Sequence, residues 1–243
     1  MFYFLTRPIT NANLVLIAAA VIPAIFLMVK VYKSDRLEKE SPGMLLRLVT
    51  AGILSSLLAL VEERIAETLL NFVLDSSMLL YNIILYFVIV AGAEESSKYL
   101  FLKRRTWNSP EFNCRYDGVV YAVFVSLGFA LWENISYVIT YGFSTALVRA
   151  VTAIPGHACF GVFMGIFYSM AKQFDYRGNK AASKLLRLFS FLFPALLHGT
   201  YDFIATLESQ QGSWYFVLFV GILFLTSFLL VSKTAKKDKY INR

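Results

Sequence analysis

Seven long apolar runs constrain the fold of this 243-residue chain more than any other feature of its sequence. A bilayer core about 30 Å thick takes ~20 helical residues to cross. The runs lie at residues 13–32, 44–61, 77–102, 117–139, 147–171, 185–206 and 213–232. Because they are continuous rather than striped at the helical period of a soluble surface helix, they need lipid as their solvent. We therefore predict an all-α, polytopic membrane helix bundle with about seven transmembrane helices.

The composition excludes several other classes of protein. Hydrophobic residues make up 58% of the chain and charged residues 16%, whereas a soluble domain usually carries about 45–50% and about 25%. Disorder and an ordinary cytosolic enzyme are therefore excluded. The two cysteines, Cys114 and Cys159, form neither a metal-type pair nor a disulfide framework. No Gly/Ser linker, low-complexity tract or internal repeat interrupts the sequence, so we expect one integral domain over residues 1–243.

The basic residues gather on alternate connectors. Groups of five flank the first, third and fifth connectors and fill the tail, and only Arg7, Arg64 and Arg149 of the 23 basic residues remain for the other side. The four groups are Lys30, Lys33, Arg36, Lys39 and Arg47; Lys98, Lys103, Arg104, Arg105 and Arg115; Lys172, Arg177, Lys180, Lys184 and Arg187; Lys233, Lys236, Lys237, Lys239 and Arg243. The positive-inside rule then predicts an outside N-terminus and a cytoplasmic C-terminus. Topology and anionic lipid head groups explain the net charge of +7, so no nucleic acid partner is needed.

One charged stretch lies between the second and third predicted spans. Residues 62–76 mix charges with Leu and Phe, so we expect an amphipathic continuation or an interfacial segment there. Glu62 and Glu63 are predicted to be solvated charges of that connector.

Ionisable and amide side chains also occur inside four of the predicted spans. Such a charged side chain costs roughly 2.5–3.5 kcal/mol on insertion scales, which makes it a functional candidate. Both histidines of the chain are in this set. The third span carries Glu94, Glu95 and Lys98, the fourth Glu133 and Asn134, the fifth His157, and the sixth His198 and Asp202.

Helical spacing indicates that these side chains meet. Glu94 and Lys98 are separated by four residues, as are His198 and Asp202, so each pair shares one helix face. The predicted depths of these side chains in the membrane agree less well with one another. Glu94 lies about 8 residues from the basic end of its predicted span, against about 14–16 for Glu133 and both histidines, which is a difference of roughly 9–12 Å.

The residue types point to hydrolysis assisted by a metal. Two histidines and a carboxylate with an open fourth position form a catalytic zinc set, which lowers the pKa of a bound water to about 7. We predict that His157, His198 and Glu133 hold zinc, with Asp202 as a fourth ligand or as a residue that orients a ligand. Glu94 or Glu95 then supplies the general base, and no H-E-x-x-H or G-x-S-x-G pattern offers an alternative.

Four strings within residues 94–202 resemble the motifs of PrsW-type intramembrane proteases. They are Glu94-Glu95-Ser96-Ser97-Lys98, Phe129-Ala130-Leu131-Trp132-Glu133-Asn134, His157-Ala158-Cys159-Phe160-Gly161 and His198-Gly199-Thr200-Tyr201-Asp202. A more distant similarity connects them to the CAAX prenyl endopeptidase and Abi membrane proteins, where a histidine takes the place of Glu133.

The resemblance implies a membrane-embedded, metal-dependent peptidase of the bacterial cytoplasmic membrane. It implies a membrane-anchored anti-sigma factor as substrate, whose first cut starts a stress response. By motif position, Glu94, Glu95 and Lys98 would be catalytic, with Glu94 as the water-activating base, Glu95 as its neighbour and Lys98 fixing their charge. The resemblance also implies that Glu133, His157 and His198 bind the metal and that Asp202 supports it. Asn134 would lie beside the metal ligands.

Two other classes of function compete with the protease. Buried Glu, Lys, His and Asp also build proton or cation relays in transporters, although residues 1–120 and 121–243 show no match of the kind expected for inverted repeats. A non-catalytic scaffold would explain the small-residue surfaces such as Gly161-x-x-x-Gly165, but not the ionisable groups in four spans.

Overall fold

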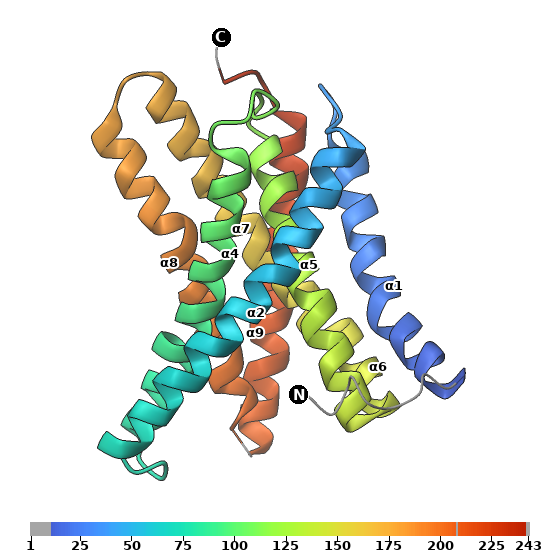
Figure 1. Cartoon of the computed structure of the whole chain (residues 1–243), viewed down its shortest axis with the longest axis vertical. Helices are drawn as coiled ribbons and strands as arrows, with labels where there is room; N and C mark the ends of the chain where they lie inside the picture. Colours follow the sequence, from blue (N-terminus) through green and yellow to red (C-terminus); the bar gives the residue numbers. More distant parts are fainter. Residues whose placement is uncertain (1–10, 208, 242–243) are drawn as a thin grey trace.

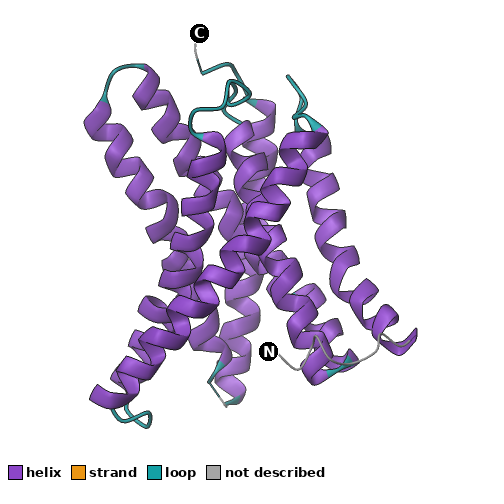
Figure 2. Cartoon of the chain, viewed as in Figure 1, coloured by secondary structure: helices purple, strands orange, loops and turns teal. Residues whose placement is uncertain are grey.

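The structure is a computed structural model that describes residues 11–207 and 209–241, and within them it is built from helices (Figure 2). Seven helical stretches are long and apolar enough to cross a membrane, which confirms the predicted fold class. The elements are α1 (Asn11–Ser34), α2 (Pro42–Val73), α3 (Leu79–Ile83), the π-helical η2 (Ile84–Val90), α4 (Ala91–Thr106), α5 (Asp117–Tyr141), α6 (Phe143–Val151), α7 (Ala153–Tyr176), α8 (Lys180–Ala205) and α9 (Gln210–Lys236).

The second span is longer than predicted. Ser41 caps α2 by accepting a hydrogen bond from the Met44 backbone N–H at 3.1 Å, and Pro42 occupies the first helical position. The helix then continues without a break to Val73, so the charged stretch is a continuation of the helix rather than a connector. The prediction that Glu62 and Glu63 are connector charges is therefore wrong, since both lie within α2.

The third span consists of three consecutive helical pieces, α3, η2 and α4. The π-helical turns of η2 were not predicted, because hydropathy does not distinguish one helical hydrogen-bond pattern from another. Such π-helical segments are frequent at functional sites, and η2 ends directly before the helix that carries Glu94, Glu95 and Lys98.

Helix α5 forms the centre of the bundle, with α2, α7 and α1 around it (Figure 1). In the membrane-spanning part of α5, 78% of the residues are buried within the protein, against 17% in the peripheral α9. Small residues permit this packing. A Cβ atom at Gly165 of α7 would lie 2.4 Å from the carbonyl oxygen of Gly118 of α5, so the two backbones are in direct contact. The predicted Gly161-x-x-x-Gly165 packing surface is thus in use.

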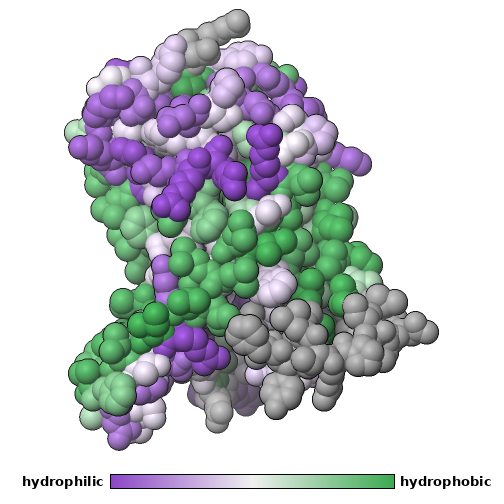
Figure 3. All heavy atoms as spheres, in the orientation of Figure 1, coloured by the Kyte–Doolittle hydropathy of each residue, from purple (hydrophilic) through white to green (hydrophobic). Residues whose placement is uncertain are grey.

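The connectors with the predicted basic groups lie at one end of the bundle, where α1, α4, α7 and α9 end and α2 and α8 begin. In the face shown in Figure 3, hydrophilic side chains gather at that end above a hydrophobic belt. Arg7 and Arg243, which also enter the charge pattern, lie outside the described residues. That this end faces the cytoplasm remains a prediction from the positive-inside rule.

The contact of α2 with α5 gives a test of the packing. A Cβ atom at Gly128 would lie 2.4 Å from the Val49 carbonyl oxygen, whereas one at Gly221 on α9 would meet nothing within 4 Å. We expect Gly128→Ala to force the two helices apart and to lower the melting temperature in detergent by roughly 2–10 °C. Gly221→Ala is the matched control and should not lower it. Equal melting of both variants would contradict this packing.

Candidate metal and catalytic site

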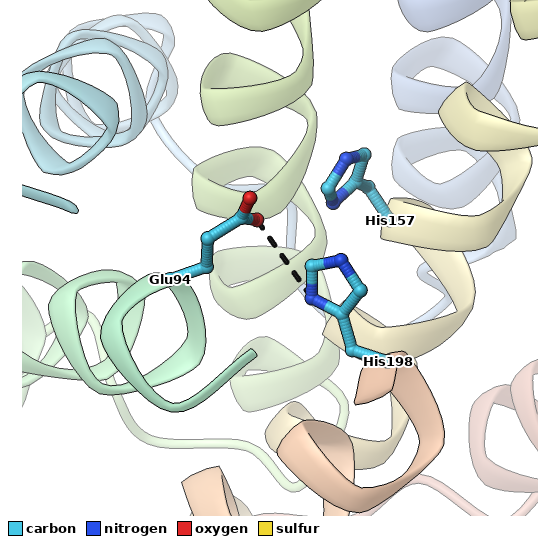
Figure 4. A group of neighbouring side chains, drawn as sticks. All are labelled: Glu94, His157 and His198. Carbon is cyan, nitrogen blue, oxygen red and sulfur yellow. Dashed lines mark ion pairs between the residues drawn. The ribbon is translucent and has the colours of Figure 1, made fainter. Parts of the chain in front are cut away.

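Four helices bring the predicted polar side chains together in the membrane-spanning part of the bundle. Glu94, Glu95 and Lys98 come from α4, His157 from α7 and His198 from α8, and each is at most 5% exposed. Glu133 of α5 completes the convergence through a contact with His157. Figure 4 shows Glu94 and both imidazoles directed toward one another. The predicted meeting of these side chains is present in the structure.

Lys98 forms the centre of the cluster and is entirely buried. Its Nζ lies 3.0 Å from Glu94 Oε2 and 2.7 Å from Glu95 Oε1, and it donates a third hydrogen bond to His157 Nδ1 at 3.2 Å. The ring of Phe129 lies below it, with the centroid 3.9 Å from Nζ. Three polar partners and one aromatic face compensate the desolvation of this ammonium group.

Each histidine has a carboxylate at its outer nitrogen. Glu133 Oε2 lies 2.8 Å from His157 Nε2, and Asp202 Oδ2 lies 3.3 Å from His198 Nε2. The Nδ1 atoms face inward instead, that of His198 being 3.1 Å from Glu95 Oε1. Since His157 Nδ1 accepts from Lys98, its proton is on Nε2 and is donated to Glu133. Carboxylates that orient histidine ligands in this way are typical of metal sites.

Glu94, His157 and His198 have the geometry of a metal-binding group. Each offers one ligand atom, and the three atoms lie within 4.8 Å of one another. Two imidazoles and one carboxylate are the donor set of a catalytic zinc site. In addition, Glu95 Oε2 is buried without a hydrogen-bond partner, which leaves an acceptor free at the same place. The residues present therefore fit a divalent metal. Binding it would replace the contact of Lys98 with His157 Nδ1 and that of Glu95 with His198 Nδ1.

The other two predicted ligands, Glu133 and Asp202, lie outside this group of close ligand atoms. The Glu133 oxygen that contacts His157 is also paired with Arg149, and Asp202 contacts the outer nitrogen of His198. Neither carboxylate belongs to the group of three close ligand atoms among the described residues. Asn134, predicted beside the metal ligands, donates to the Ala20 carbonyl oxygen at 3.3 Å and so connects α5 to α1.

Arg149 of α6 is a residue that the sequence reasoning missed. Its guanidinium group lies 2.9 Å from Glu133 Oε2, donates to Asn134 Oδ1 at 2.9 Å, and stacks 3.9 Å above the Tyr137 ring. In the sequence analysis, Arg149 was used only as one of the three basic residues on the side of the membrane opposite the basic connectors. Its position within the apolar run 147–171 was the signal, because a charge inside a span requires a partner.

Two further carboxylates on α2 were also missed. Glu62 Oε2 accepts a hydrogen bond from Ser97 Oγ of α4 at 3.1 Å. Glu63 is half-buried and lies within electrostatic range of Glu94, Glu133 and His198. Both were assigned to a connector because the charges of residues 62–76 interrupt the apolar run.

The depth difference expected from the sequence does not prevent the contacts. Helix α4 continues to Thr106, beyond the predicted end at residue 102, which places Glu94 deeper in the bundle. Helix α8 also approaches η2 closely at the residue after His198. A Cβ atom at Gly199 would lie 2.9 Å from the Phe87 Cα atom, so only glycine fits there. This approach brings His198 to the carboxylates at the start of α4.

Comparisons with known proteins show the family of the chain. Residues 40–230 match the model of the PrsW family intramembrane metalloproteases. The chain belongs to the PrsW family. Protease PrsW of Bacillus subtilis is 33% identical over 227 residues, covering 93% of this chain and 97% of its own length. Protease PrsW of Halalkalibacterium halodurans is 32% identical over 226 residues, covering 92% of this chain and 99% of its own length. Protease PrsW of Clostridioides difficile is 29% identical over 229 residues, covering 92% of this chain and 90% of its own length.

Membership of this family, together with the seven spans, identifies the chain as a protease and a multi-pass protein of the bacterial cell membrane. The recognised motifs thus led to the correct family. No solved structure matches the chain.

Substitution of Arg149 tests whether its ion pair with Glu133 is needed to position His157. We expect Arg149→Gln to lower cleavage of a membrane-anchored test protein by about 10–100-fold, because Arg149 holds the Glu133 carboxylate that contacts His157. Arg149→Lys should restore part of the activity, because it keeps the charge beside Glu133. The control is Arg64→Gln on α2, whose side chain is 74% exposed. Equal activity of Arg149→Gln and Arg64→Gln would contradict a role for Arg149.

Proposed function

We propose that this protein is a zinc-dependent intramembrane endopeptidase in which Glu94, His157 and His198 hold the metal. The observation that carries the proposal is the approach of one ligand atom from each of these buried residues to within 4.8 Å of the others. The family match supports a metal-dependent reaction, and the choice of zinc follows from the N/O donor set.

Zinc bound there would polarise the scissile carbonyl and lower the pKa of the attacking water. Glu133 and Asp202 fix the two imidazole rings through Nε2, so that both Nδ1 atoms are directed inward. These two Nδ1 atoms would bind the metal in place of their present contacts with Lys98 and Glu95. This assignment differs from the one expected from the sequence. Glu94, expected from its motif position to be the base, replaces Glu133 as the carboxylate ligand. Asp202 orients His198, which is one of the two roles expected for it.

Glu95 is the group that we assign as general base. Its Oε1 accepts a hydrogen bond from Lys98, while its Oε2 is buried without a partner and can accept a proton from the attacking water. The Lys98 ammonium group contacts both neighbouring carboxylates and offsets their mutual repulsion. Arg149 pairs with the same Glu133 oxygen that contacts His157 Nε2, and so holds that carboxylate against the ring.

The substrate that we propose is a membrane-anchored protein of the anti-sigma factor type. This part of the proposal rests on the motif resemblance and on the relatives named Protease PrsW. We further propose that residues 1–243 act as one integral protease domain with an outside N-terminus and a cytoplasmic C-terminus.

Metal content and cleavage separate the assigned roles. We expect Glu94→Gln, His157→Ala and His198→Ala each to lose bound zinc and activity when the protein is purified in detergent. Glu95→Gln should keep zinc but lose cleavage by about 10²–10⁴-fold. The matched control is Glu67→Gln, whose side chain on α2 is 38% exposed.

Two results would refute these roles: stoichiometric zinc in both histidine variants, or full cleavage by Glu95→Gln. A cation flux across sealed vesicles without any peptide substrate would instead support the transporter class considered above.

A further inference from the structure

A cavity of about 550 Å³ lies between α1, α7 and α9, on a side of α7 that is separate from the metal site. Pro155, Ala158 and Cys159 of α7 line it, whereas His157 faces the carboxylates of α4. Aliphatic and aromatic side chains such as Leu27 make up most of the remaining wall. Its volume is within the usual range of small-molecule sites, about 300–1,000 Å³.

The lining is charged at one end only. Lys30, Lys33 and Arg36 belong to the wall, at the basic end of the bundle, and no acidic residue lines the cavity. The Lys30 Nζ lies 4.9 Å from the centre of the Phe228 ring, so this ammonium group lies between α1 and α9. An occupant must therefore combine an apolar body with an anionic group at the level of the lipid head groups.

We propose that this cavity binds an anionic phospholipid. Its phosphate contacts Lys30, Lys33 and Arg36, and one acyl chain lies along Val162 and Phe228. Basic pockets between transmembrane helices attract anionic head groups in this way. A transmembrane helix is a poorer fit. With side chains it is about 10–12 Å across, so 550 Å³ holds little more than one turn of it.

Native mass spectrometry of the protein in detergent tests the site, with phosphatidylglycerol and phosphatidylcholine as probes. We expect the anionic lipid to be retained in preference to the zwitterionic one. The variant Lys30→Gln/Lys33→Gln/Arg36→Gln should bind it about a hundredfold more weakly, since each basic side chain near the head group contributes roughly fivefold. The matched control removes three basic charges at the end of α4, Lys103→Gln/Arg104→Gln/Arg105→Gln, and should keep the preference.

A second variant tests the apolar part without changing charge. Val231→Phe fills the cavity and should reduce retention of phosphatidylglycerol at least tenfold, while bound zinc stays unchanged as a measure of folding. Equal retention of the two lipids, or unchanged retention in the triple variant, would overturn the proposal. Loss of cleavage in Val231→Phe with unchanged lipid retention would also overturn it, because the occupant would then be the transmembrane helix of a substrate.

Discussion

The ion cluster around Lys98 is the interaction on which the rest of the structure depends. A fully buried ammonium group between two carboxylates in a membrane-spanning bundle is stable only if every charge has a close partner. Removing one partner would leave an uncompensated charge in a medium of low polarity. Both carboxylates lie on α4 beside Lys98, and the cluster reaches the other helices through the imidazoles. Lys98 contacts His157 of α7 and Glu95 contacts His198 of α8, so these contacts connect the three helices. The same arrangement brings both imidazoles to Glu94.

Close packing of small residues makes this arrangement possible. Gly52 and Gly128 allow α2 to contact α5, and Gly165 allows α7 to contact the same helix from another side. Gly199 does the same for α8 and η2, directly beside His198. Transmembrane helices have little hydrophobic driving force for association in lipid, so such contacts contribute much of the packing energy. The polar cluster and the glycine contacts thus stabilise each other.

The sequence predicted the spans and the converging residues well, because both depend on local features. Apolar runs identify membrane helices, and a charge inside a run marks a buried partner, as for Lys98. Roles within the cluster depend on distances between helices, which spacing along the chain does not give. Glu133 was therefore taken as a ligand, although its oxygen is paired with Arg149 from another helix. Glu63 was missed because it was assigned to a solvated connector, whereas α2 continues through it to Val73.

X-ray absorption at the zinc edge tests the central claim most directly. For the zinc-loaded protein, the structure predicts two imidazole nitrogens at about 2.0–2.1 Å and at least one oxygen at about 2.0–2.2 Å. Glu94→Gln should alter this coordination, while Glu133→Gln should keep two imidazoles and the oxygen. An unchanged spectrum for Glu94→Gln together with a lost oxygen ligand in Glu133→Gln would show that the metal is held by the other carboxylate.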